Sequence, residues 1–216
     1  MQVVPASRSR DLIELIVGYG AIIGTVWSAE HLQAILSPFV LVLTLVIVLA
    51  RRPSRDELGM GWRGLVASLW ILPAAVALAV LSIVTAAEIG TLHPLYKAGT
   101  GHVAGYILWT IYQQVLLQDY FLPRLLGLVK NEAVAVGLTA VLFAAAHMPN
   151  LALTVVTLIW GIASCVAFRR YRNLWILGLA QGLLGLCFAI CVPDALHHHL
   201  RVGLGYLRYQ SGHRVP

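Results

Sequence analysis

Charged residues are scarce in this sequence: aspartate, glutamate, lysine and arginine together make up only 11% of the 216 residues. A typical soluble domain carries about 25% charged residues. Hydrophobic residues, by contrast, make up 59% of the chain. This composition excludes a soluble globule and an intrinsically disordered chain, and it predicts a protein whose surroundings are mainly lipid.

Cysteine is also rare, and its three copies lie inside apolar runs, at Cys165, Cys187 and Cys191. An odd number of cysteines within helices argues against the disulfide framework of a small secreted protein. We expect these residues to be small buried apolar side chains. The net charge of +6 comes from short basic clusters between apolar runs, which is typical of a membrane protein, so we expect no nucleic-acid partner.

Seven apolar runs divide the chain, each near the ~20 residues that cross a bilayer as a helix. Their approximate bounds are 12–29, 34–50, 65–86, 103–126, 132–147, 151–168 and 174–191. A backbone in lipid must satisfy its own hydrogen bonds, which favours helices at these lengths. The sequence therefore predicts an all-α, polytopic membrane helix bundle of about seven to eight transmembrane helices, with residues 1–216 forming a single membrane domain.

Basic residues alternate along the connections between these runs. The N-terminal segment and the connections after the second, fourth and sixth runs carry them, whereas the remaining connections carry at most one. The positive-inside rule then places the N-terminus in the cytoplasm, and we expect an integral protein of a bacterial inner membrane. Residues 192–216 carry arginines on the opposite side, and we interpret them as an interfacial, His-rich tail.

The fourth run is unusually polar, because it contains Gln113, Gln114, Gln118 and Asp119. Gln114 and Gln118 are four residues apart and share one face of a helix. Polar side chains inside a membrane are costly and need partners or a purpose. This cluster indicates either a polar interior site or hydrogen bonds that hold neighbouring helices together.

Three more polar positions follow in the later part of the chain. His147 closes the fifth run two residues before Pro149, and it serves either as an acid–base group or ligand, or as an interfacial residue. Gln181 lies among Gly178, Gly182 and Gly185, which predict a close-packing face. The tail contains His197, His198 and His199, which either join His147 or lie in a solvated interface.

The order of these elements resembles the CPBP intramembrane protease family, which includes the type II CAAX prenyl endopeptidases. That family has two adjacent glutamates followed by an arginine, then Phe-x-x-x-His, then a histidine on the last helix. Phe143–His147 matches the middle motif in full. The resemblance places Gln113 and Gln114 at the glutamate pair, Gln118 at the arginine and Gln181 at the last histidine, within a core of residues 103–191.

This resemblance implies an intramembrane endopeptidase, metallo- or water-activating, that hydrolyses peptide bonds of membrane-associated protein or peptide substrates within the lipid bilayer. The implied catalytic positions are His147, Gln113, Gln114, Gln118 and Gln181, with Asp119, Asn150, His197 and His199 as accessory residues. A divalent metal such as zinc would bind at His147. Glutamine cannot act as a general base and is a weaker, neutral metal ligand, so the base would be His147, a tail histidine or Asp119.

Two other functions remain open because the glutamate pair is absent. One is a catalytically inactive scaffold or binding protein of the same family, a pseudoprotease. The other is a small transporter or lipid-handling protein, although the repeated broken helices typical of transporters are absent from the sequence pattern.

Overall fold

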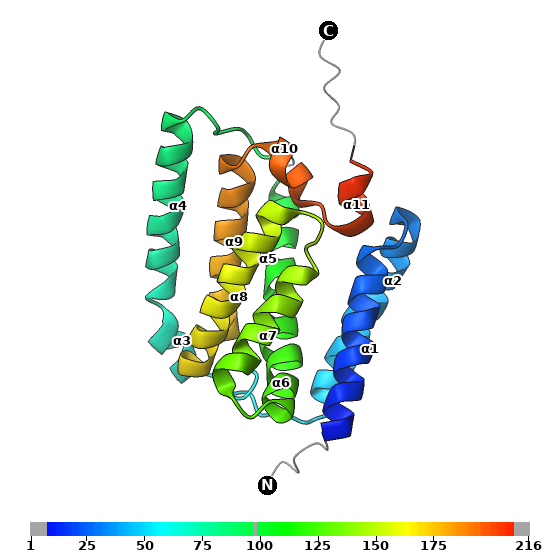
Figure 1. Cartoon of the computed structure of the whole chain (residues 1–216). Coiled ribbons are helices and arrows are strands. Elements are labelled where there is room, and N and C mark those ends of the chain that lie inside the picture. The colour runs from blue at the N-terminus through cyan, green and yellow to red at the C-terminus, as the bar shows by residue number, and fades with distance from the viewer. Residues whose placement is uncertain (1–7, 97–98, 210–216) are drawn as a thin grey trace.

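The computed structural model describes residues 8–96 and 99–209, and within these ranges the chain forms helices and turns with no β-strand (Figure 1). The all-α prediction is therefore confirmed for the described residues. The helices are α1 (Arg8–Val26), α2 (Glu30–Leu49), α3 (Trp62–Ser68), α4 (Ile71–Glu88), α5 (Thr100–Gln114), the π-helix η1 (Val115–Phe121), α6 (Leu122–Leu128), α7 (Glu132–Ala145), α8 (Leu151–Tyr171), α9 (Leu174–Cys191), α10 (Asp194–His197), the 3-10 helix η2 (His198–Leu200) and α11 (Gly203–Leu207).

All seven predicted apolar runs are helical, but not all of them are long and apolar enough to be identified as membrane spans. Within the described residues, four segments meet that standard by length and composition: 30–49, 62–88 (α3 and α4 taken together), 151–171 and 174–191. The run in α7 is shorter, because the helix ends at Ala145 and His147 lies in the turn beyond it. The count of seven to eight transmembrane helices therefore stays a prediction.

Three asparagines fix where the last long helices begin. Asn131, Asn150 and Asn173 each occupy the N-cap of α7, α8 or α9, and each side chain accepts a hydrogen bond from a backbone N–H three residues later. Such a cap stabilises a helix by about 0.5–2 kcal/mol. Because Asn150 starts α8 immediately after the α7–α8 turn, the turn that carries His147 is held close to the start of α8.

The glycines of α9 pack against α5, as the sequence predicted. A methyl group added at Gly178 would lie 2.9 Å from the Cα of Ile111, and one added at Gly182 would lie 3.1 Å from Oγ1 of Thr110. The same Thr110 hydroxyl donates a 2.9 Å hydrogen bond to the carbonyl of Gly178. This close approach brings the polar side chains of α5 and α9 within reach of each other.

The basic connections all lie at one end of the bundle, the lower end in Figure 1, together with the N-terminal end of α1. At the same end Glu14 pairs with the buried guanidinium of Arg124 at 2.7 Å and also with Arg51. These ion pairs tie α1 and the end of α2 to α6. The opposite end carries the α1–α2, α4–α5 and α7–α8 connections, covered in part by α10, η2 and α11 (Figure 1). Which end faces the cytoplasm remains a prediction.

Candidate active site

Four glutamines form a continuous chain of hydrogen bonds between α5, η1 and α9. Gln118 donates to Gln114 at 3.0 Å, Gln114 donates to Gln181 at 2.6 Å, and Gln181 donates to Gln113. Trp160 of α8 also donates its indole N–H to Gln181 at 3.0 Å. The predicted shared face of Gln114 and Gln118 is therefore observed, and both of these residues are buried.

Each glutamine in this series of hydrogen bonds donates to the next, so the NH2 group of Gln113 is the last donor of the series. Oε1 of Gln113 accepts from Gln181, and no acceptor for Nε2 of Gln113 lies within hydrogen-bond distance in the part of the chain that the structure describes. At the other end, Gln118 lies in the π-helix η1 and also approaches the hydroxyl of Ser164 at 3.4 Å. π-helical turns are often found at functional sites.

His147 is held by its own backbone. Nδ1 lies 2.8 Å from the carbonyl oxygen of Phe143, one helical turn earlier. A carbonyl only accepts hydrogen bonds, so Nδ1 carries the proton and Nε2 keeps its lone pair. The ring of Phe143 contacts the imidazole edge to face, with 4.9 Å between the ring centroids. The sequence motif Phe-x-x-x-His therefore builds a histidine with a fixed tautomer.

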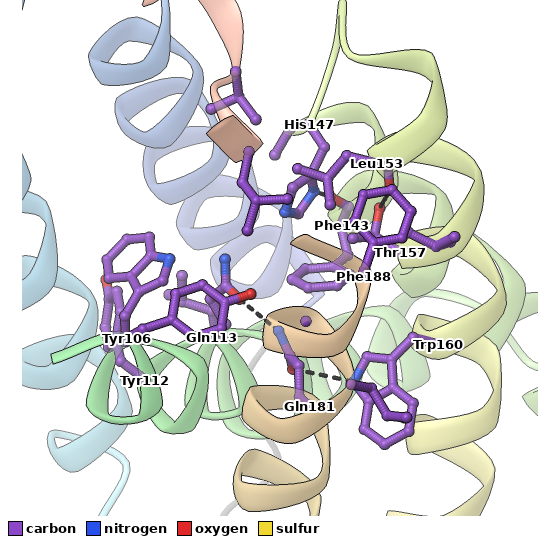
Figure 2. Close-up of a pocket in the computed structure, with 18 of the residues that line it drawn as sticks. Tyr106, Tyr112, Gln113, Phe143, His147, Leu153, Thr157, Trp160, Gln181 and Phe188 are labelled. Carbon is purple, nitrogen blue, oxygen red and sulfur yellow. Dashed lines mark hydrogen bonds between the residues drawn. The ribbon is translucent and has the colours of Figure 1, made fainter. Parts of the chain in front are cut away.

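His147, Gln113 and Gln181 line one large cavity of about 750 Å³ (Figure 2). The figure shows the Gln113–Gln181–Trp160 hydrogen bonds on one side and the imidazole on another. Apolar and aromatic side chains make up most of the wall, among them Tyr106, Trp109, Tyr112, Phe143, Trp160 and Phe188. A large apolar cavity with a few convergent polar groups is the usual form of a small-molecule or substrate site.

The remaining predicted accessory residues lie elsewhere. Asp119 is buried in η1 and is not part of the cavity wall, and its Oδ2 has no hydrogen-bond partner within residues 8–96 and 99–209. Asn150 has a structural role, because it caps α8 and donates to the carbonyls of His197 and Arg201 at 2.8 and 3.0 Å.

The tail histidines do not join His147. Both ring nitrogens of His197 bond to backbone groups, Nε2 to the carbonyl of Val192 and Nδ1 to the N–H of Leu200. His199 instead lies 3.3 Å from the carboxylate of Asp194, and burial lowers its pKa below the usual value. The tail is thus held by bonds of its own, although residues 210–216 lie outside the described residues.

The donor set around His147 does not suit a zinc ion. Among the described residues, no three histidine, cysteine, aspartate or glutamate side chains gather closely enough to hold a metal. The cavity wall does contain two thiols, Cys187 and Cys191, but its other polar groups besides His147 are amides, hydroxyls and indole N–H groups. Zinc in proteins is bound by thiolates, imidazoles and carboxylates, usually four of them in a structural site and three in a catalytic one. We therefore derive no chemical step through a metal.

Comparison with known proteins decides the family. The family model for type II CAAX prenyl endopeptidase, Rce1-like, matches residues 10–187, which is most of the chain. The chain belongs to this family. The match extends from α1 into α9, so the α1–α2 pair belongs to the shared region as well as the later helices. No curated protein and no solved structure matches the chain.

The four glutamines that the sequence resemblance aligns with polar positions of the family meet between α5, η1 and α9. Their equivalence to the family's site residues stays a prediction. Sequence reasoning missed Trp160, whose indole N–H joins the amide chain. The only sequence signal for it was a tryptophan in an apolar run, where a buried N–H needs an acceptor.

Proposed function

We propose that this chain is an intramembrane endopeptidase that cleaves membrane-associated proteins or peptides, with His147 as the general base. The observation that carries the proposal is that one cavity receives both a lone pair, on Nε2 of His147, and a free donor, the NH2 of Gln113. Hydrolysis of an amide needs a group that takes a proton from water and a donor for the carbonyl oxygen.

The proposed reaction uses these two groups in turn. Nε2 of His147 removes a proton from a water molecule as its oxygen attacks the carbonyl carbon of the substrate. The NH2 of Gln113 donates a hydrogen bond to the carbonyl oxygen as negative charge develops on it. The imidazolium then returns its proton to the leaving amine as the C–N bond breaks. Gln181, Gln114 and Gln118 are positioning residues, because their chain of hydrogen bonds holds Gln113.

The cleavage of membrane peptides tests this proposal. Purified protein, reconstituted in bilayers, is incubated with a set of lipid-modified peptides, and the products are identified by mass spectrometry. His147→Ala is expected to lower the rate by about 10²–10⁴-fold, the usual contribution of a general base. His102→Ala is the matched control, since His102 is exposed near the start of α5. Equal cleavage by the wild type and His147→Ala would overturn the proposal.

A second function is favoured by one specific observation: no aspartate or glutamate lies among the described residues that line the cavity. A cavity that holds only neutral polar groups suits binding without turnover, as in a pseudoprotease. On this alternative the double variant Gln113→Glu, Gln114→Glu gains activity or metal binding that the wild type lacks. Turnover of any substrate by the unmodified protein excludes it.

We also propose that the N-terminus faces the cytoplasm of a bacterial cell. The support is the collection of basic connections at one end of the bundle (Figure 1), since basic connections favour the cytoplasmic side. The test uses two single-cysteine variants, Arg55→Cys and Gln33→Cys, made in a protein that lacks the native cysteines. Intact cells that contain each variant are treated with a membrane-impermeant maleimide. We expect labelling only at position 33, and labelling only at position 55 would reverse the orientation.

A further inference from the structure

A second pocket of about 370 Å³ adjoins the cavity at the end of the bundle that carries the tail. It lies between the start of α2 and the segment that leads into α11. The two hollows have three wall residues in common: Gln33, Leu200 and Val202. The apolar cavity and the smaller pocket are therefore neighbours that share part of their wall.

The smaller pocket has the opposite character from the cavity. Its wall carries two arginines, Arg201 and Arg208, against one carboxylate, Glu30. Both arginines are exposed, and neither forms an ion pair with any described residue. The guanidinium of Arg201 lies over the ring of Tyr209, with 5.6 Å to the ring centroid. The pocket therefore has an excess of positive charge that no carboxylate among the described residues neutralises through an ion pair.

The backbone that carries these arginines is anchored to the turn that carries His147. The amide of Asn150 donates to the carbonyl of Arg201 at 3.0 Å, and the N–H of Gly203 donates to the carbonyl of Met148 at 2.8 Å. Gly203 adopts a positive φ of 53° and lies against the carbonyl of Val26 at the end of α1. The polar pocket thus has a fixed position beside the cavity.

We propose that the two adjoining pockets open into each other and bind one anionic lipid of the surrounding bilayer. Its phosphate lies between Arg201 and Arg208, and one acyl chain occupies the apolar cavity. Arginine forms strong, charge-assisted hydrogen bonds with phosphate oxygens. This inference goes beyond the proposed peptidase function, because binding needs neither His147 nor any hydrolysis.

The head group must supply the selectivity of such a site. An acyl chain gains little hydrophobic free energy when it moves from a bilayer into an apolar cavity, because the bilayer interior is equally apolar. The two arginines, in contrast, discriminate an anionic head group from a zwitterionic one. The site is therefore expected to distinguish lipids by charge and to tolerate differences in chain chemistry that the cavity can accommodate.

Lipid binding to the purified full-length protein tests the proposal by native mass spectrometry in a non-ionic detergent. The probes are lysophosphatidylglycerol and lysophosphatidylcholine with the same palmitoyl chain. The wild type is expected to bind the anionic probe at least tenfold more tightly. Arg201→Gln combined with Arg208→Gln is expected to weaken that binding about 25-fold, at about fivefold for each arginine, and to weaken binding of the zwitterionic probe less, because its choline cation offsets the attraction of its phosphate to the arginines.

Three controls separate this site from other causes. Arg63→Gln removes an exposed arginine from the other end of the bundle and is expected to leave binding unchanged. Val202→Trp fills the junction between the two pockets and is expected to weaken the binding of both probes. Inorganic phosphate at the same concentration is expected not to displace the lipid, because it lacks the chain; displacement would assign the site to a free anion.

These binding measurements test the lipid proposal independently of whether the protein has proteolytic activity. Equal affinity for the two probes, or an equal loss in the Arg63 variant, would overturn it by showing binding to the general surface. If the double variant does not fold, Arg208→Gln alone is used, after its melting temperature has been shown to match the wild type. A single variant with unchanged affinity then also overturns the proposal.

Discussion

Gln114 of α5 donates a 2.6 Å hydrogen bond to Gln181 of α9, and this bond joins residues 67 positions apart in the chain. The acceptor oxygen is shared with Trp160 of α8. One amide group therefore links three helices in the middle of the bundle. The same group orients Gln113 through its own NH2, so the stability of the bundle and the geometry of the candidate site depend on the same side chain.

Gln181→Leu is expected to destabilise the protein more than Gln113→Leu. Loss of Gln181 leaves the donors of buried Gln114 and half-buried Trp160 without an acceptor, which costs about 1–3 kcal/mol. Loss of Gln113 removes only the last bond of the chain, worth about 1 kcal/mol. Equilibrium unfolding of both variants in mixed detergent–SDS micelles measures the difference. An equal cost would show that Gln181 does not connect the three helices energetically.

Gly178→Ala and Gly137→Ala are expected to change stability in opposite directions. A methyl group at Gly178 would contact the backbone of Ile111, whereas one at Gly137 meets no atom within 4 Å. We expect the Gly178 variant to lose about 1–3 kcal/mol through overpacking. The Gly137 variant, on the open side of α7, gains up to about 1 kcal/mol from helix propensity. The same unfolding assay compares them, and equal effects would contradict the observed packing of α9 on α5.

Glu14→Gln is expected to cost about 3 kcal/mol, because it leaves the buried guanidinium of Arg124 without its carboxylate. Glu132→Gln is the matched control. Glu132 pairs with Arg169 on the surface, and exposed pairs contribute little to stability, so no measurable change is expected. A similar loss in the two variants would mean that Glu14 and Arg124 are not buried together.

Stability of the tail is expected to fall as the pH is lowered below about 7. Burial lowers the pKa of His199 below its ordinary value of 6.5, so the unfolded state takes up a proton first and stability begins to fall near that pH. Burial alone would raise the pKa of Asp194, but the hydrogen bonds from Tyr209 and the backbone of His199 outweigh it and hold the pKa below 3.8.

The stabilising contribution of Asp194 is therefore present above pH 3.8 and is lost as the pH falls through its lower, folded-state value. Hydrogen exchange of residues 194–207 between pH 8 and pH 4, corrected for the intrinsic exchange rate at each pH, measures the loss of stability that comes from His199. Asp194→Asn is expected to show weaker protection already at pH 8 and a pH dependence at least as large as that of the wild type, because the carboxylate of Asp194 raises the pKa of His199 and its removal lets that pKa fall further. Protection that stays constant over this range in the wild type would contradict the prediction.

Sequence periodicity and length were sufficient to predict the helices, because an apolar run in lipid has few alternatives to a helix. The glycine face of α9 was also predictable, since small residues at helical spacing allow close approach. The candidate site was predictable only in part. His147, Gln113 and Gln181 line one cavity, whereas Gln114 and Gln118 are buried behind it. That these residues form an active site stays a prediction.

The tail histidines and Asp119 could not be placed from the sequence. A histidine run indicates metal binding or a solvated segment equally well, and only the fold shows that His197 bonds to Val192 and Leu200. The position of Asp119 depends on the π-helix, which shifts the side chains that follow relative to a regular helix. The apolar pattern of the fourth run carries no signal for that change in helix type.

The bond between Nδ1 of His147 and the carbonyl of Phe143 has an evolutionary consequence. A histidine oriented by an acidic side chain loses its orientation when that acid mutates, whereas a backbone carbonyl is present whatever residue occupies position 143. Replacement of nearby acids by neutral residues would therefore leave this imidazole in place. A lineage can change its chemistry around such a ring without first having to rebuild the ring's support.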